Sequence, residues 1–285
     1  MHNIEKLACL PEAFLENVIS DRLGKSNNPR THTQKELARI KPLLIECYVI
    51  YDKLFSKNKL ELIQRKINIT ENDKESFAKL YSREFPSYNA ILDLARSHNS
   101  GTCPYCSINL PTTIDHFVPK KEYPEYAAHC HNLIPVCADC NRRKKEQWRN
   151  NYQRLFLNPY LDKLEDYNFL GVRVTIEDNK PSILFYIENR GNISDSLFRI
   201  IETHYQILKI IETLNNACIE TFYSIQSDLV TEVKMRNASL EKIMQLHVEQ
   251  AMRKLQCFGK NHWKSLLEKA IFENKEFCTY IIDNT

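Results

Sequence analysis

Two Cys-x-x-Cys pairs constrain this chain more than any other feature of its sequence. Cys103 and Cys106 form the first pair and Cys137 and Cys140 the second, with 30 residues between the pairs. Each pair offers two thiolates to one ion, and four thiolates complete the closed tetrahedral coordination that Zn²⁺ takes in structural sites. Because such a site has no open position, we expect the zinc to stabilise a small module rather than to react.

Other potential ligands lie in the spacer between the pairs. His129, Cys130 and His131 are possible substitute ligands, but the two pairs already fill four positions, so we favour the cysteines. A thioredoxin-like redox role for either pair has less support, because no βαβ pattern surrounds them.

The remaining cysteines are scattered through apolar or helical-looking sequence, where a buried thiol is the ordinary interpretation. They are Cys9, Cys47, Cys130, Cys218, Cys257 and Cys278. The sequence contains no run of about 18 apolar residues and no secretory signal pattern at its beginning. We therefore expect a cytoplasmic protein that has no membrane partner.

Composition and periodicity predict a mainly helical protein. Hydrophobic residues make up 43% of the chain, enough for a sizeable core, and only 5 of 285 residues are glycine. Apolar residues recur at helical spacing in 11–24, 35–55, 71–85, 196–218, 229–255 and 262–282. Thr70 is the predicted N-cap of the third of these helices, and Pro86 is expected to stop it.

Two segments depart from the helical pattern. Residues 169–177 and 181–188 flank the turn 178–180 and predict a β-hairpin. Residues 99–155 contain turn formers, the Cys pairs and short β-prone runs. The sequence thus predicts an α+β protein: a helical region 1–98, a zinc-stapled module 99–155, and a region 156–285 of hairpin plus helices.

The positive charge is concentrated in the module. The whole chain carries +3, whereas residues 95–155 hold nine Lys or Arg against five acidic residues, a local +4. This local excess favours a nucleic-acid partner. A solvated helix face would also account for part of it.

An Asp-His pair and an Asn inside the module suit metal-dependent phosphodiester hydrolysis. His116 can act as general base, since a neutral imidazole near pH 7 accepts the proton of an attacking water. Asp115 and Asn141 offer hard oxygen atoms that suit Mg²⁺ or Mn²⁺. In a helix beginning near Asp139, one face would carry Asn141, Lys144, Lys145 and Trp148, with Trp148 packing into the core.

The pattern C-x2-C…DH-x2-P…NL-x3-C-x2-C-N-x2-K resembles the HNH endonuclease family. The resemblance implies a ββα-metal fold in which two strands and a helix surround one catalytic ion. It implies that His116 is the base, that Asp115 binds the metal, and that Asn132 braces the loop between the strands. Asn141 stands where the family often has His, which resembles the HNN variants and tilts the metal preference towards Mg²⁺.

The basic residues around this motif are the predicted substrate contacts, namely Lys120, Arg142, Arg143 and Lys144. Tyr123 and Tyr126 near Lys120 either stack on bases of a single strand or pack on the module, and we favour packing. His204 and His247 lie in helical patterns and are expected to be packing or surface residues.

A weaker likeness extends beyond the module. The segments DHFVPKKEYPEYA, FLNPYLD and ETHYQILKI look like a group of stand-alone bacterial HNH proteins that includes the PtuB-type nucleases of Septu antiphage systems and retrons. That resemblance implies an antiviral defence role and a partner ATPase bound to the helical regions. The alternative function is a non-catalytic, zinc-stapled module that binds nucleic acid or a protein.

Overall fold

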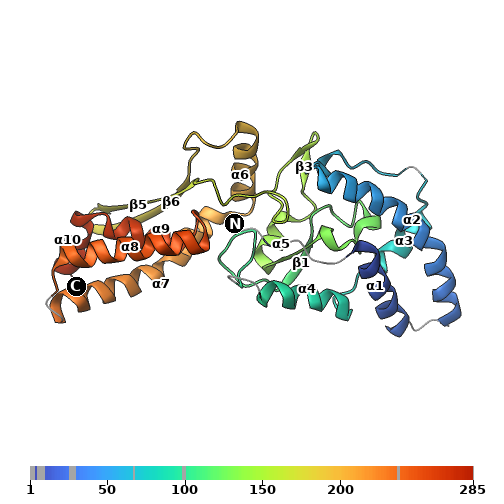
Figure 1. Ribbon diagram of the computed structural model, residues 1–285, viewed down its shortest axis with the longest axis horizontal. Helices are drawn as coiled ribbons and strands as arrows, with labels where there is room; N and C mark the ends of the chain where they lie inside the picture. The colour runs from blue at the N-terminus through green and yellow to red at the C-terminus, as the bar shows by residue number, and fades with distance from the viewer. Residues whose placement is uncertain are drawn as a thin grey trace. The chain divides into compact units, whose positions relative to one another are not determined.

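A computed structural model describes residues 4, 10–25, 30–66, 68–97, 101–235 and 238–284 (Figure 1). Cys9 and the predicted boundary between residues 98 and 99 lie outside the described residues. The chain forms two compact units, Met1–Lys163 and Leu164–Thr285. The division into 1–98, 99–155 and 156–285 stays a prediction, and the predicted boundary at 156 lies within the first unit.

In the first unit, helices pack against the small module. These are α1 (Pro11–Lys25), α2 (Arg30–Ser56), α3 (Glu71–Ala78) and α4 (Pro86–Ser97), with a short 3-10 turn η1 (Leu60–Leu62). Helix α1 packs on α2 and α4, and α2 also packs on α3. Helix α2 buries a stripe at helical spacing, made of Leu37, Ile40, Leu44, Cys47, Tyr48, Tyr51 and Phe55.

The module itself is a two-stranded sheet followed by a helix. Strand β1 (Thr113–His116) pairs antiparallel with β2 (Leu133–Val136), and α5 (Ala138–Lys144) follows. The register sets His116 opposite Leu133. Both α4 and α5 contact β1, as Figure 1 shows. The connection between the strands contains two 3-10 turns, η2 (Pro124–Tyr126) and η3 (Cys130–Asn132).

A second small hairpin closes the first unit. Strand β3 (Arg149–Asn150) pairs with β4 (Gln153–Arg154). The guanidinium of Arg154 then donates to both carboxylate oxygens of Asp162, at 2.8 and 2.9 Å. This bidentate pair holds the connector after the module against the unit.

The second unit packs a hairpin on helices. Strands β5 (Leu170–Glu177) and β6 (Lys180–Ile187) contact α7, α9 and α10 (Figure 1). Asp178 and Asn179 both have positive φ, at 49° and 57°, as a two-residue hairpin turn requires. The helices are α6 (Asp195–Ile207), α7 (Ile210–Val230), α8 (Leu240–Phe258), α9 (Trp263–Phe272) and α10 (Lys275–Asp283), with a π-helical turn η4 (Thr231–Met235) after α7.

The α+β prediction is confirmed, and so are the hairpin and the N-cap. Thr70 accepts from the backbone of Asp73, whose carboxylate accepts in turn from Thr70, which forms a capping box. Pro86, however, does not stop the preceding helix. Helix α3 already ends at Ala78, and Pro86 begins α4, because the first turn of a helix tolerates the missing N–H.

The long helices expected in the second unit are each broken. Lys209 adopts a left-handed φ of 51° between α6 and α7, η4 interrupts the next segment, and residues 273–274 separate α9 from α10. Helix α5 is also shorter than expected, because Lys145 has a φ of 54°. Lys145 and Trp148 therefore lie beyond α5 and do not share its face, although Trp148 is buried as predicted.

The burial of the remaining cysteines, of two tyrosines and of His204 tests the predictions made for them. The buried thiols are Cys47, Cys130, Cys218 and Cys278, whereas Cys257 is exposed, contrary to expectation. Tyr123 and Tyr126 are buried, which confirms packing over stacking on bases, and His204 is also buried. Among the described residues, none of the helices has the length and apolar character needed to cross a membrane.

Candidate active site

The four paired cysteines converge on one point. Their Sγ atoms all lie within 4.8 Å of one another, and those of Cys106 and Cys137 are 4.0 Å apart. Tetrahedral zinc with Zn–S bonds of about 2.3 Å sets sulfur atoms about 3.8 Å apart, so the arrangement fits a structural Zn²⁺. Cys103, followed by Cys106 and Cys140, lowers the pKa of the Cys137 thiol. Burial, by contrast, raises the pKa of the Cys103 thiol, and the hydrogen bonds of the cluster raise the pKa of the Cys140 thiol.

The substitute ligands considered for this zinc are not part of the cluster. His129 and His131 instead form a separate group with Asp52 of α2. The four cysteines therefore form the donor cluster by themselves, as predicted.

Asn141 joins α5 to β1. Its Nδ2 donates to the Thr113 hydroxyl at 3.1 Å and to the Ile114 carbonyl at 3.2 Å. Since a carbonyl only accepts, the amide nitrogen must face β1, and Oδ1 is directed away from these partners as an acceptor. Asn141 is half-buried, so it lies at the edge of the β1–α5 interface.

Asp115 and Lys144 form a buried ion pair. The Lys144 Nζ lies 3.1 Å from each carboxylate oxygen of Asp115, and it also donates to the His116 carbonyl at 3.0 Å. The Tyr105 hydroxyl donates to Asp115 at 2.8 Å. Asp115 is 3% exposed and Lys144 is 0% exposed.

This burial corrects the role predicted for Lys144. A fully buried ammonium that is bound to a carboxylate cannot contact a substrate phosphate in this conformation. The sequence predicted that Lys144 faces the phosphate because it falls on the same helical face as Asn141. Its aliphatic stem and its pairing with Asp115 instead place it in the interior.

His116 is held in one tautomer. Its Nε2 lies 3.0 Å from the Ala127 carbonyl, and because that oxygen only accepts, Nε2 carries the proton and Nδ1 is the basic nitrogen. Burial, then the charges of Lys120 and Lys144, lower the pKa of His116 to about 3, although the Ala127 bond opposes this. The imidazole is therefore neutral at pH 7, as a general base must be.

The side chains of Asp115 and His116 have different neighbours. Asp115 contacts Lys144 of α5, whereas the His116 ring packs edge-on against Tyr81 at 4.6 Å between centroids. Asp115 and Asn141 thus lie at the β1–α5 interface, and the His116 ring, at the end of β1, packs against Tyr81.

Two basic residues, Lys120 and Arg83, lie near Tyr81 on the side of the candidate base. The Lys120 Nζ is 3.6 Å from the centroid of the Tyr81 ring. Burial and the nearby charge of Arg83 lower the pKa of Lys120. Tyr81 and Arg83 lie between α3 and α4, outside the motif, and sequence reasoning missed both because nothing in their local pattern marks them.

The other predicted substrate contacts differ in their surroundings. Arg142 is exposed and forms an ion pair with Asp139 at 2.8 Å, while Arg143 is half-buried. Tyr105 was also missed as a partner of Asp115, although its place inside the first Cys pair is a usable signal.

Asn132 fastens the connection between the strands. Its Oδ1 accepts from the Val118 N–H at 2.7 Å and from the Tyr51 hydroxyl at 3.3 Å. Its Nδ2 donates to the carbonyls of Val118 and Tyr126, each at 3.0 Å. Because Tyr126 directly precedes Ala127, these bonds also fix the carbonyl that sets the His116 tautomer.

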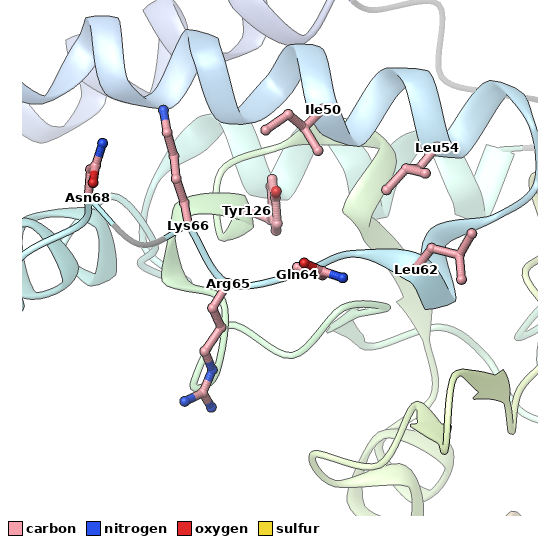
Figure 2. Close-up of a pocket in the computed structure, with 8 residues that line it drawn as sticks. All are labelled: Ile50, Leu54, Leu62, Gln64, Arg65, Lys66, Asn68 and Tyr126. Atoms are coloured by element: carbon pink, nitrogen blue, oxygen red, sulfur yellow. The ribbon is translucent and has the colours of Figure 1, made fainter.

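An open hollow lies elsewhere on the first unit. Figure 2 shows it between α2 and the segment after η1, with Arg65 directed away from it. It is lined by Ile50, Leu54, Leu62, Gln64, Arg65, Lys66, Asn68 and Tyr126. The predicted site residues are not among these, so the hollow is separate from the candidate active site.

Part of the chain is similar to known proteins. Residues 103–147 match the family model described as HNH endonuclease. Protein ea31 of Escherichia phage lambda is 32% identical over 111 residues, which make up 38% of each chain. No solved structure matches the chain. An HNH endonuclease family domain therefore occupies residues 103–147, and the match spans well under half the length of the curated relative.

Proposed function

We propose that this chain is a metal-dependent endonuclease that hydrolyses phosphodiester bonds of DNA or RNA. The observation that carries the proposal is the state of His116, a neutral imidazole whose Nε2–H is fixed on the Ala127 carbonyl. Its position within the matched HNH segment supports the assignment.

His116 acts as the general base in this proposal. Its Nδ1 takes a proton from the water that attacks the phosphorus atom. Lys120 lies close enough to affect the pKa of His116, and its charge, with that of Arg83, would attract the phosphate to this face. Asn132 acts indirectly, because it holds the loop that fixes the His116 tautomer.

Asp115 and Asn141 are the proposed ligands of Mg²⁺ or Mn²⁺. The donor chemistry fits, since the contacts of Asn141 with Thr113 and Ile114 do not use its amide oxygen, and a carboxylate accepts more bonds than the two partners of Asp115 use. When bound, the cation supplies charge stabilisation for the phosphate and the leaving oxygen. Lys144 already neutralises Asp115, so a cation there competes with its ammonium.

The test is cleavage of plasmid, single-stranded DNA and total RNA with Mg²⁺. In His116→Gln the amide still donates to the Ala127 carbonyl but has no basic nitrogen, so cleavage should fall by at least about a hundredfold. His32→Ala is the matched control, because His32 is exposed on α2. Unchanged zinc content and melting temperature would show that the fold persists, and retained cleavage by His116→Gln would refute the assignment.

One observation favours the non-catalytic alternative. The pairing of Asp115 with Lys144 satisfies the carboxylate without any metal. A binding module would retain nucleic acid equally well with and without Mg²⁺ and cleave none of the substrates. Binding that strengthens with Mg²⁺ and weakens in Asn141→Ala would instead favour the enzyme.

We also propose that the second unit binds a partner, an ATPase in a cytoplasmic antiphage system, as the resemblance to PtuB-type nucleases implies. Its helices α7 and α8 expose large apolar side chains, including Ile219, Tyr223 and Leu246. With a candidate ATPase co-expressed, Tyr223→Asp should prevent complex formation, while Leu184→Asp, an exposed position on β6, should not. Equal complex formation by both variants would contradict this.

A further inference from the structure

A second group of metal-ligating side chains lies outside both the cysteine cluster and the proposed catalytic site. Asp52 comes from α2, while His129 precedes η3 and His131 lies within it, on the connection between β1 and β2. One ligand atom of each residue lies within 4.8 Å of the others. The group therefore brings together side chains from α2 and from the β1–β2 connection, which are far apart in the sequence.

The distances fit coordination better than hydrogen bonding. The Asp52 Oδ1 lies 3.4 Å from the His129 Nε2 and 3.6 Å from the His131 Nδ1. An N–H···O bond is ordinarily 2.7–3.2 Å long. A tetrahedral ion about 2.0–2.2 Å from each ligand instead sets ligand atoms about 3.3–3.6 Å apart.

Burial makes the arrangement costly without a ligand. His131 is 3% exposed, and neither of its ring nitrogens has a hydrogen-bond partner within the described part of the chain. A buried polar group left in this state destabilises a fold. Its Nδ1 faces the Asp52 carboxylate, so a cation between them would satisfy this nitrogen and the carboxylate together.

The rings are fixed before any ion binds. Tyr51 packs against His129 with centroids 4.1 Å apart, and Phe55 stacks on His131 at 5.0 Å and 14° between planes. The Tyr51 hydroxyl also donates to the His131 carbonyl at 3.2 Å. Asp52 has an exposed side, with 44% of its side chain accessible, so an ion can enter from solvent.

We propose that Asp52, His129 and His131 bind a second zinc-type divalent transition metal ion, distinct from the four-cysteine zinc. Two imidazoles and one carboxylate are a donor set that Zn²⁺ takes with its fourth position open. The ion ties α2 to the connection that carries Asn132 and Ala127. It thus stabilises the loop beside the candidate base.

The test is the metal content of the full chain after reconstitution with Zn²⁺ and removal of unbound metal. Wild type should hold two equivalents per chain, and Asp52→Asn and His131→Ala should each hold one. Cys137→Ser should lose the other equivalent, and His32→Ala, which changes an exposed histidine on the same helix, should keep both. One equivalent in wild type, or two in Asp52→Asn, would overturn the proposal.

Cobalt substitution identifies which site is lost and guards against misfolding. Co²⁺ bound to thiolates gives intense sulfur-to-metal charge-transfer absorption, whereas Co²⁺ on imidazole and carboxylate gives only weak visible bands. His131→Ala should keep the charge-transfer absorption and lose the weak bands. Asp52→Asn is isosteric at a half-exposed position, so it retains the fold, and because a direct ligand is lost, Co²⁺ affinity at this site should fall by more than the roughly hundredfold loss that an outer-shell change causes. Equal affinity in wild type and Asp52→Asn would contradict the assignment.

Discussion

Replacing Lys144 with Met tests the most unusual feature of the module, its buried ion pair. The substitution keeps the length and apolar stem of the side chain but removes the ammonium from Asp115 and from the His116 carbonyl. Asp115 would then be a buried carboxylate whose remaining hydrogen bond comes from Tyr105.

The expected loss of stability follows from the geometry. Opposite charges 3.1 Å apart attract by about 5 kcal/mol at an effective dielectric constant of about 20. Removing one partner of a buried pair typically costs about 3–5 kcal/mol, because the other charge is left uncompensated. For a unit of this size, that loss lowers the melting temperature by roughly 6–20 °C.

Urea unfolding of the full chain measures this loss. The chain has two tryptophans, so a Trp263→Phe background leaves Trp148, buried in the first unit, as the fluorescent reporter. Lys145→Met is the control, because Lys145 is exposed, and it should change the free energy of unfolding by less than about 0.5 kcal/mol.

A double-mutant cycle with Asp115→Asn isolates the interaction. Because the two groups contact each other, the double variant should be more stable than the sum of the single losses predicts, by about 1–3 kcal/mol. Losses that add to within about 0.5 kcal/mol would refute the reasoning, as would a Lys144→Met variant as stable as wild type.

Three further predictions concern other parts of the chain. Cys137→Ser should lower zinc content and melting temperature together, and an unchanged metal analysis would contradict the structural-zinc interpretation. Asn132→Ala should cost at least about 2 kcal/mol, because the Val118 N–H loses its buried acceptor; equilibrium unfolding measures this, and a loss below about 0.5 kcal/mol would contradict it. The hydrogen bond to Glu268 raises the pKa of His247, so this contribution to stability is complete below about pH 6.5 and is lost as pH rises through the raised pKa. The stability difference between wild type and His247→Gln should therefore shrink from pH 6 to pH 9, and a difference constant over that range would argue against the assigned pair.

The periodicity of apolar residues predicted where the helical segments lie but not where they break. Spacing of apolar residues located the helical segments because a buried helical face needs them every three or four residues. It did not locate the breaks, such as Lys209 between α6 and α7. A left-handed residue is selected by how two helices pack, and nothing in a Leu-Lys sequence marks it.

For the candidate site too, the sequence determined some features and left others to the fold. The sequence alone determined the four-cysteine cluster, because two residues between ligands is the span of one metal-binding turn. It also located the Asp-His pair and Asn141 around the first strand and the helix. Those relations are local, so residue type and spacing carry them.

Only the tertiary structure decided the surroundings of these residues. Packing of α5 on β1 buried Lys144 against Asp115, and packing of α2 on the inter-strand connection brought Asp52 to His129 and His131. Contacts between distant segments depend on which faces pack together, and spacing along one segment does not encode that. The sequence thus determined which groups are available for chemistry, and the fold decided which of them meet.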